Sequence, residues 1–248
     1  MPTTGDLADD LTAAVRGSEI FAVYQPQVSL ESGSIVAAEA LCRWRHPRLG
    51  DIDPVTMIGV AERSGAIHAL GRRMLDECLE TLDGWRETGR DWAVAVNVSP
   101  LQFADESFAA HVAGEFSRRQ LAPGSLVFEL PRDLPPVGNG AVLPQLHMLR
   151  EIGVEFSLAG AGEESPSPEL LRGLPVAEVK LPGELVRAAE RPATASLREQ
   201  VEVAHAHGLR VVAEGIETLT HLDIAVELGC DRAQGFLIRQ PHSEIVFP

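Results

Sequence analysis

The sequence predicts an α/β fold, a TIM-like (β/α)8 barrel with an antiparallel first strand. Apolar segments of strand length alternate with amphipathic segments of helix length along most of the chain, a pattern typical of parallel βαβ units that close into a barrel. Two opening strands flank Gly33 in an ESGS turn, which predicts a hairpin and therefore an antiparallel strand. The length of 248 residues suits one such barrel. We therefore expect a single domain over residues 1–248, with a core of about 20–243.

Each element is predicted from local signals. The strands are expected at residues 20–30, 35–44, 92–99, 126–130, 154–158, 176–181, 209–215 and 230–237. A helix over 7–16 precedes them, and Pro54 begins a longer helical region that breaks near Gly65 and ends near Gly89. Ser99 is the N-cap of a helix that reaches about residue 120. Three later helices are each predicted to end at a glycine, namely Gly153, Gly208 and Gly229.

Composition argues against several classes of partner. The chain has 21 basic and 36 acidic side chains and a net charge of −15, which repels nucleic-acid backbones and anionic lipids. We therefore expect no DNA, RNA or membrane partner. Cys42, Cys78 and Cys230 are odd in number and lack CxxC spacing, so neither a disulfide framework nor a structural zinc site is expected. With no apolar run of membrane-spanning length and an acidic N-terminus, a cytoplasmic location is expected.

Polar side chains stand at the ends of successive predicted strands. They are Glu39 with Arg43, then Asn97, Glu129, Lys180, Glu214 and Gln234. Because barrel active sites form at the C-terminal ends of the strands, we expect these groups to converge. Carboxylate and amide oxygens suit Mg²⁺ or Mn²⁺, and an arginine matches a phosphate, so the set is typical of metal-assisted phosphodiester chemistry. The alternative is a buried polar network in which Arg43 and Lys180 only balance the carboxylate charges.

The sequence resembles the EAL domain family, whose members have TIM-like barrels and hydrolyse cyclic di-GMP. The phrases that carry the resemblance span nearly the whole chain in order: YQPQVSLESGSIVAAEALCRWRHP, VNVSPLQF, LVFEL, LPVAEVKLP, LRVVAEGIET and GCDRAQGFL. The resemblance implies metal ligands at Glu39, Asn97 and Glu129, and a pair that handles the attacking water at Lys180 and Glu214. It implies ligand contacts at Gln25, Pro26, Leu41, Arg43, Glu214 and Gln234.

One loop departs from the family pattern. Active members carry DDFGTGYSSL where this chain has AGAGEESPSP, so Ala159 and Gly160 replace two metal-bridging aspartates. Arg132 replaces the second Glu of an ExxE phrase, and Pro182 replaces the Asp of a KID phrase. Without bridging carboxylates we expect weak Mg²⁺ or Mn²⁺ binding or none, and no required cofactor. Lys180 and Glu214 are then remnants of a catalytic site.

The resulting expectation is a degenerate EAL-like domain that acts as a regulatory cyclic di-GMP sensor or as a protein-interaction module. Two alternatives stay open: a weakly active metal-dependent phosphodiesterase, and a purely protein-binding barrel with an empty pocket. The expected partners are cyclic di-GMP and a protein, with a homodimer left open. The other candidates are expected to be structural, surface or capping residues, namely His46, His205, His207, Trp44, Trp85 and Trp92.

Overall fold

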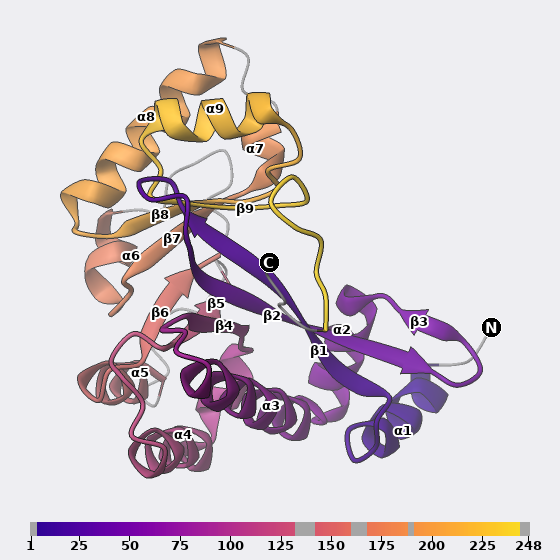
Figure 1. Ribbon diagram of the computed structural model, residues 1–248. Coiled ribbons are helices and arrows are strands. Elements are labelled where there is room, and N and C mark those ends of the chain that lie inside the picture. The colour runs from indigo at the N-terminus through magenta and orange to yellow at the C-terminus, as the bar shows by residue number, and fades with distance from the viewer. Residues whose placement is uncertain (1–3, 132–141, 160–167, 188–190, 244–248) are drawn as a thin grey trace.

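The computed structural model describes residues 4–131, 142–159, 168–187 and 191–243, and within them eight strands close into a barrel (Figure 1). β1 (Ile20–Ser29) pairs antiparallel with both of its neighbours, β2 (Ile35–His46) and β9 (Arg232–Gln234). All other neighbours in the ring are parallel, which confirms the predicted fold class. The remaining strands of the ring are β4 (Ala93–Asn97), β5 (Leu126–Leu130), β6 (Glu155–Leu158), β7 (Glu178–Leu181) and β8 (Arg210–Ala213).

Helices cover the outside of the barrel (Figure 1). They are α1 (Thr4–Ala14), α2 (Pro54–Ser64), α3 (Ile67–Glu87), α4 (Glu106–Arg118), α5 (Val142–Glu151), α6 (Pro168–Gly173), α7 (Gly183–Arg187), α8 (Arg191–Ala206) and α9 (Leu219–Leu228). The break at Gly65 and the three glycine caps are confirmed, since Gly65, Gly153, Gly208 and Gly229 have φ of 78°, 107°, 72° and 83°.

Three features differ from the sequence prediction, and the first is α6 (Pro168–Gly173), a short helix between β6 and β7 where none was expected. A ninth strand, β3 (Gly50–Ile52), pairs antiparallel with the end of β2, and its three residues are too few to show a periodic pattern. The single helix expected after Ser99 is divided into a short 3₁₀ helix, η1 (Pro100–Ala104), and α4. The division arises because Asp105 accepts the N–H of Ser107 at 2.9 Å and thereby caps a new helix.

The N-terminal end of the barrel is closed by ion pairs between the first residues of consecutive strands. The Glu178 carboxylate is 3.4 Å from Arg210 Nε and 3.2 Å from Arg232 Nη1, and Arg210 also pairs with Glu155. A small cluster of buried residues inside the barrel is separate from the main core between sheet and helices: Ala37, Ala93, Ala95 and Val127. Apolar side chains and ion pairs thus occupy this end of the barrel.

The residues that the sequence assigned to structural roles have such roles. His46 is buried, with Nε2 2.9 Å from Asp10 and with Nδ1 accepting two backbone N–H groups. Trp44 is buried, and Trp85 packs edge-on against Trp92. The two nearby histidines have separate partners, because His205 contacts Asp231 and His207 contacts the carbonyl of Val203. In the described part of the chain, no helix is both long and apolar enough to cross a membrane.

We expect all three cysteines to be poorly reactive in the folded protein. Burial raises the pKa of Cys42 and Cys230 to about 12 each, and raises the pKa of the buried Cys78 thiol as well. At pH 8 a thiol reagent should therefore label the native protein far more slowly than the denatured protein. Because the folded pKa values are raised, the thiols should also lower stability as pH rises from 9.0 toward 12. Rapid labelling of native protein would contradict this assignment.

Candidate ligand site at the barrel mouth

Lys180 lies at the centre of the barrel mouth and contacts three carboxylates. Its Nζ is 2.9 Å from Glu39 Oε2, 2.8 Å from both carboxylate oxygens of Glu129 and 2.9 Å from Glu214 Oε1. We call these four residues the Lys180 cluster. The four come from β2, β5, β7 and the residue after β8, so residues far apart in the sequence meet as predicted, although Glu39 lies within β2 and not at its end. The Lys180 and Glu129 side chains are 1% and 2% exposed, whereas that of Glu214 is 31% exposed.

The pKa shifts within the Lys180 cluster follow from its charge balance. Burial by itself lowers the pKa of Lys180, but the charges of Glu129, Glu39 and Glu214 outweigh it and raise the pKa well above 10.5. Burial raises the pKa of Glu39, yet the Lys180 charge and hydrogen bonds from Gln234 and Asn97 lower it overall. Burial and the Glu39 charge raise the pKa of Glu129 well above 4.5. The three carboxylates thus share one ammonium, and the pKa rises at Glu129 but falls at Glu39.

Amide side chains extend the network around Glu39. Asn97 Nδ2 donates to Glu39 Oε1 at 2.8 Å, and Gln234 Nε2 donates to Glu39 Oε2 at 2.7 Å. Gln234 Nε2 also donates to Gln25 Oε1 at 3.1 Å, and Gln27 Nε2 donates to Gln234 Oε1 at 3.0 Å. Gln27 was not predicted as a site residue, because β1 carries no strand-end signal there. The antiparallel β1 brings it opposite Gln234.

Arg43 is not part of the Lys180 cluster. Its Nη1 donates to the backbone carbonyl of Cys42 at 2.9 Å, and no carboxylate among the described residues lies within ion-pair distance of its guanidinium. The alternative interpretation, in which these cations only balance the carboxylate charges, therefore applies to Lys180 but not to Arg43. Arg43 is half-buried on the same strand as Glu39 and Leu41. Pro26, another predicted contact, pairs with Ala38 in the β1–β2 ladder.

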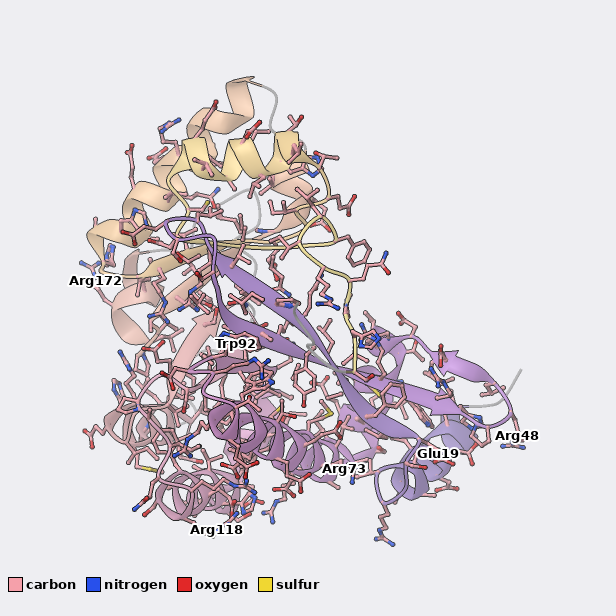
Figure 2. All side chains as sticks on the ribbon, in the orientation of Figure 1. Glu19, Arg48, Arg73, Trp92, Arg118 and Arg172 are labelled. Carbon is pink, nitrogen blue, oxygen red and sulfur yellow. The ribbon has the colours of Figure 1, made fainter. Side chains whose placement is uncertain are left out.

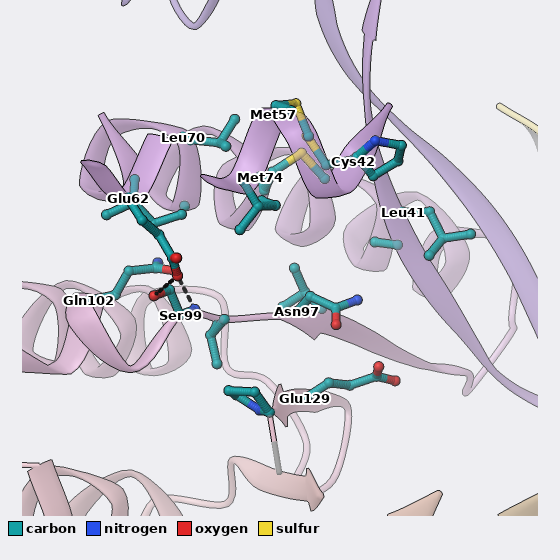
Figure 3. A pocket seen from close by; sticks show the side chains of 18 of the residues that line it. Leu41, Cys42, Met57, Glu62, Leu70, Met74, Asn97, Ser99, Gln102 and Glu129 are labelled. Carbon is teal, nitrogen blue, oxygen red and sulfur yellow. Dashed lines mark hydrogen bonds between the residues drawn. The ribbon is translucent and has the colours of Figure 1, made fainter. Parts of the chain in front are cut away.

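A pocket of about 650 Å³ leads from the mouth between β2, α2, α3 and η1 (Figure 3). Its volume is in the range of small-molecule sites. One end is lined by Glu39, Asn97, Glu129 and Ala159, and Leu41 and Arg43 line its side along β2. Apolar side chains of α2 and α3 line another wall, among them Met57, Ile58, Leu70 and Met74, and Glu62, Ser99 and Gln102 are polar lining residues. The pocket thus combines carboxylate and amide groups at the mouth with an apolar wall, and Arg43 is a cationic residue in its lining.

After β6, the next strand of the ring beyond β5, the residue at the mouth is Ala159, whose side chain is a methyl group. Ala159 follows β6, and its backbone N–H donates to the Leu130 carbonyl at 2.8 Å, which holds it beside the end of β5. Pro182 follows β7 directly. Gly160 and Arg132 lie outside the described residues. Within the described ranges, no group of three or more His, Cys, Asp or Glu side chains is arranged to hold a metal ion.

Lys180 carries a sequence signal that strand-end reasoning missed. It is the only lysine of the chain, and the other 20 of the 21 basic residues are arginines. Arginines such as Arg48 and Arg118 point outward at the periphery (Figure 2), and their side chains are 73% and 60% exposed. A compact ammonium can fit among three carboxylates where a planar guanidinium needs more room. The only lysine of an arginine-rich chain therefore indicates a buried position where an ammonium fits and a guanidinium does not.

Comparison with known proteins identifies relatives over almost the whole chain. The family model described as "EAL domain" matches residues 8–241. MucR of Pseudomonas aeruginosa, a bifunctional diguanylate cyclase/cyclic di-GMP phosphodiesterase, is 32% identical over 238 residues, which cover 95% of this chain and 35% of MucR. RocR of the same organism, a cyclic di-GMP phosphodiesterase, is 28% identical over 237 residues, covering 95% of this chain and 60% of RocR. The chain thus spans 35–60% of the length of these two relatives.

Solved structures match the barrel equally well. The phosphodiesterase PaMucR, in complex with c-di-GMP, has a TM-score of 0.87 and 32% identity, with 96% of this chain and 97% of that chain covered. The EAL domain of Mycobacterium smegmatis DcpA has a TM-score of 0.74 and 29% identity, with coverage of 90% and 93%. The FimX EAL domain of P. aeruginosa, bound to c-di-GMP, has a TM-score of 0.82, 18% identity and coverage of 98% and 99%, which supports the fold alone.

We expect Lys180→Met to destabilise the protein strongly. The substitution leaves the buried carboxylates of Glu39 and Glu129 without their cation, which costs about 3–5 kcal/mol for a buried ion pair. Glu214→Gln is the matched control, since its side chain is 31% exposed and its loss should cost about 1 kcal/mol or less. Denaturant unfolding at neutral pH measures both. Equal losses of unfolding free energy in the two variants would show that the buried carboxylates of Glu39 and Glu129 do not depend on Lys180.

Proposed function

Because the chain belongs to the EAL domain family, we propose that it is a catalytically silent member that binds cyclic di-GMP at the mouth of its barrel. MucR, 32% identical to this chain, is named for its action on cyclic di-GMP, and the structure of its phosphodiesterase contains c-di-GMP. In this chain the pocket beside the mouth offers Arg43 as a cation for a ligand phosphate and an apolar interior for a flat ring. These features support ligand binding without chemistry.

The proposed lack of catalytic activity rests on one observation, the contact of Lys180 with three carboxylates next to Ala159. Glu39 and Glu129 direct oxygens to the Lys180 ammonium at 2.8–2.9 Å. Ala159 supplies no oxygen on the neighbouring strand. Within the part of the chain that the structure describes, the residues at the mouth therefore do not fit a pair of divalent cations, which requires a carboxylate to bridge them. Because Lys180 already neutralises part of the charge, the mouth can bind an anionic ligand without metal.

A weakly active phosphodiesterase is the second candidate. It is favoured by the convergence of Glu39, Asn97, Glu129, Lys180 and Glu214 on one mouth. RocR, with 28% identity, is named as a phosphodiesterase. Both candidates share the same pocket, so turnover and binding must be measured separately.

We expect the purified protein to release no linear product from cyclic di-GMP in Mg²⁺ or Mn²⁺. Chromatography after a long incubation tests this, with a Glu39→Ala variant as the control for contaminating activity. The double variant Ala159→Asp, Gly160→Asp should gain measurable metal binding but only marginal turnover, because new ligands work only when surrounding contacts hold them in place. Rapid turnover by the wild type that Glu39→Ala abolishes would establish the second candidate instead.

We expect Arg43→Ala to weaken cyclic di-GMP binding by about 1.5–3 kcal/mol, or roughly 10- to 150-fold, because a charge-assisted contact to phosphate is lost. Arg45→Ala is the matched control on the same strand. Its side chain is 69% exposed and pairs with Asp51, so Kd should not change. Calorimetric titration with Mg²⁺ and with EDTA should give the same Kd. A wild-type protein that releases no heat with cyclic di-GMP would leave the protein-binding barrel as the supported function.

A further inference from the structure

The segment that follows β4 forms one wall of the pocket and is held from two sides. It begins at Asn97, whose amide bonds Glu39, and continues through Ser99 into η1. The backbone N–H of Val98 donates to the Glu129 carbonyl at 3.1 Å. Ser99 is buried, at 8% exposure, and lines the pocket. A displacement of Ser99 would therefore move Asn97, two residues before it, relative to the Lys180 cluster.

Gln102 holds this segment on the side of α3. Its Oε1 accepts the backbone N–H of Ser99 at 2.9 Å, while its Nε2 is buried and has no hydrogen-bond partner among the described residues. The residue is 1% exposed. The Ser99 N–H determines which amide atom is the oxygen, so Nε2 is turned away from Ser99 toward α3. Gln102 is among the residues that line the pocket, but its Nε2 is covered by protein atoms and its Oε1 is bonded to the loop.

Gly71 on α3 makes room for the Gln102 amide. A Cβ at position 71 would lie 1.9 Å from Gln102 Nε2 and 2.6 Å from Gln102 Cδ. Gly71 is in the interior of α3, where glycine weakens a helix relative to alanine. The close approach of Gln102 explains why a glycine occupies this position. Gly84 is on the same helix with no atom near its missing Cβ, so it provides a comparison within α3.

Glu62 on α2 holds the same segment on its other side. The Ser99 hydroxyl donates to Glu62 Oε1 at 2.7 Å, and Figure 3 shows this bond at the end of the pocket away from Asn97 and Glu129. Both residues line the pocket. The loop after β4 is thus attached to α2 through Glu62 and to α3 through Gln102, and these helices supply most of the apolar lining.

We propose that Gly71, Gln102 and Glu62 are positioning residues, which hold the loop after β4 so that Asn97 and the pocket wall keep the geometry needed for ligand binding. The inference deepens the proposed cyclic di-GMP site and depends on it for the identity of the ligand. The attachment itself is a property of the ligand-free protein. It connects two helices outside the barrel to the polar mouth through hydrogen bonds and one close packing contact.

The single lysine allows this inference to be tested with and without ligand. In protein labelled with ¹³C-lysine, the side-chain resonances of Lys180 report on the mouth, since Lys180 contacts Glu39 and Glu39 contacts Asn97. We expect Gly71→Ala to shift these resonances and to raise the Kd for cyclic di-GMP by about 3- to 10-fold. Gly84→Ala should change neither, and should raise Tm by about 1–4 °C through its helix propensity. Identical behaviour of the two glycine variants would overturn the proposal.

Variants at Glu62 separate positioning from direct contact and do not depend on the folding of Gly71→Ala. Glu62→Ala and Ser99→Ala should each shift the Lys180 resonances and weaken binding, while Glu62→Gln retains an oxygen acceptor for Ser99 and should restore both. A Glu62→Gln variant that binds as weakly as Glu62→Ala, with wild-type Lys180 resonances, would show that Glu62 acts through its charge on the ligand and would overturn the positioning role. If the wild type does not bind cyclic di-GMP, the proposed function fails, and the resonances alone decide the positioning role.

Discussion

The contact of one buried ammonium with three carboxylates is the constraint on which the barrel mouth depends. Glu39 and Glu129 are buried acids on neighbouring parts of the ring, and like charges so close together repel each other strongly in a low-dielectric interior. Lys180 offsets this repulsion from β7, and the amides of Asn97 and Gln234 satisfy further oxygens of Glu39. The same arrangement leaves Arg43 outside the cluster. The mouth is thereby stable without an added cation, while an arginine on its rim stays available to an anion.

The two ends of the barrel use charge differently. At the N-terminal end, Glu178 is paired with Arg210 and Arg232 from the next two strands, and Glu155 pairs with Arg210, so two carboxylates match two guanidinium groups. At the mouth, carboxylates outnumber the one ammonium and are supported by neutral amides. Such an excess of acceptors is unusual for a purely structural network, in which buried charges are generally paired. The mouth therefore keeps a net negative charge, whereas the charges at the opposite end are balanced.

The pocket depends on helices as well as on strand ends. Its lining includes apolar side chains of α2 and α3 as well as Glu39, Asn97 and Glu129 of the strands. The loop after β4 connects the two parts, because Ser99 bonds Glu62 on α2 while Gln102 packs against Gly71 on α3. Changes in the position of these helices should therefore be transmitted to Asn97.

The sequence alone determined the barrel class, the antiparallel hairpin and the polar strand ends, because strand and helix periodicity, turns and caps are local properties of neighbouring residues. It also marked Ala159 and Gly160 as the positions where carboxylates are absent, since the surrounding phrases stay in register. Only the tertiary structure decided which groups pair. Lys180 and Glu39 are 141 residues apart, and Gln234 and Glu39 are 195 apart, so no local pattern links them. The contact of Gly71 with Gln102 likewise depends on the packing of α3 against η1, which is set by the closed barrel and not by either segment alone.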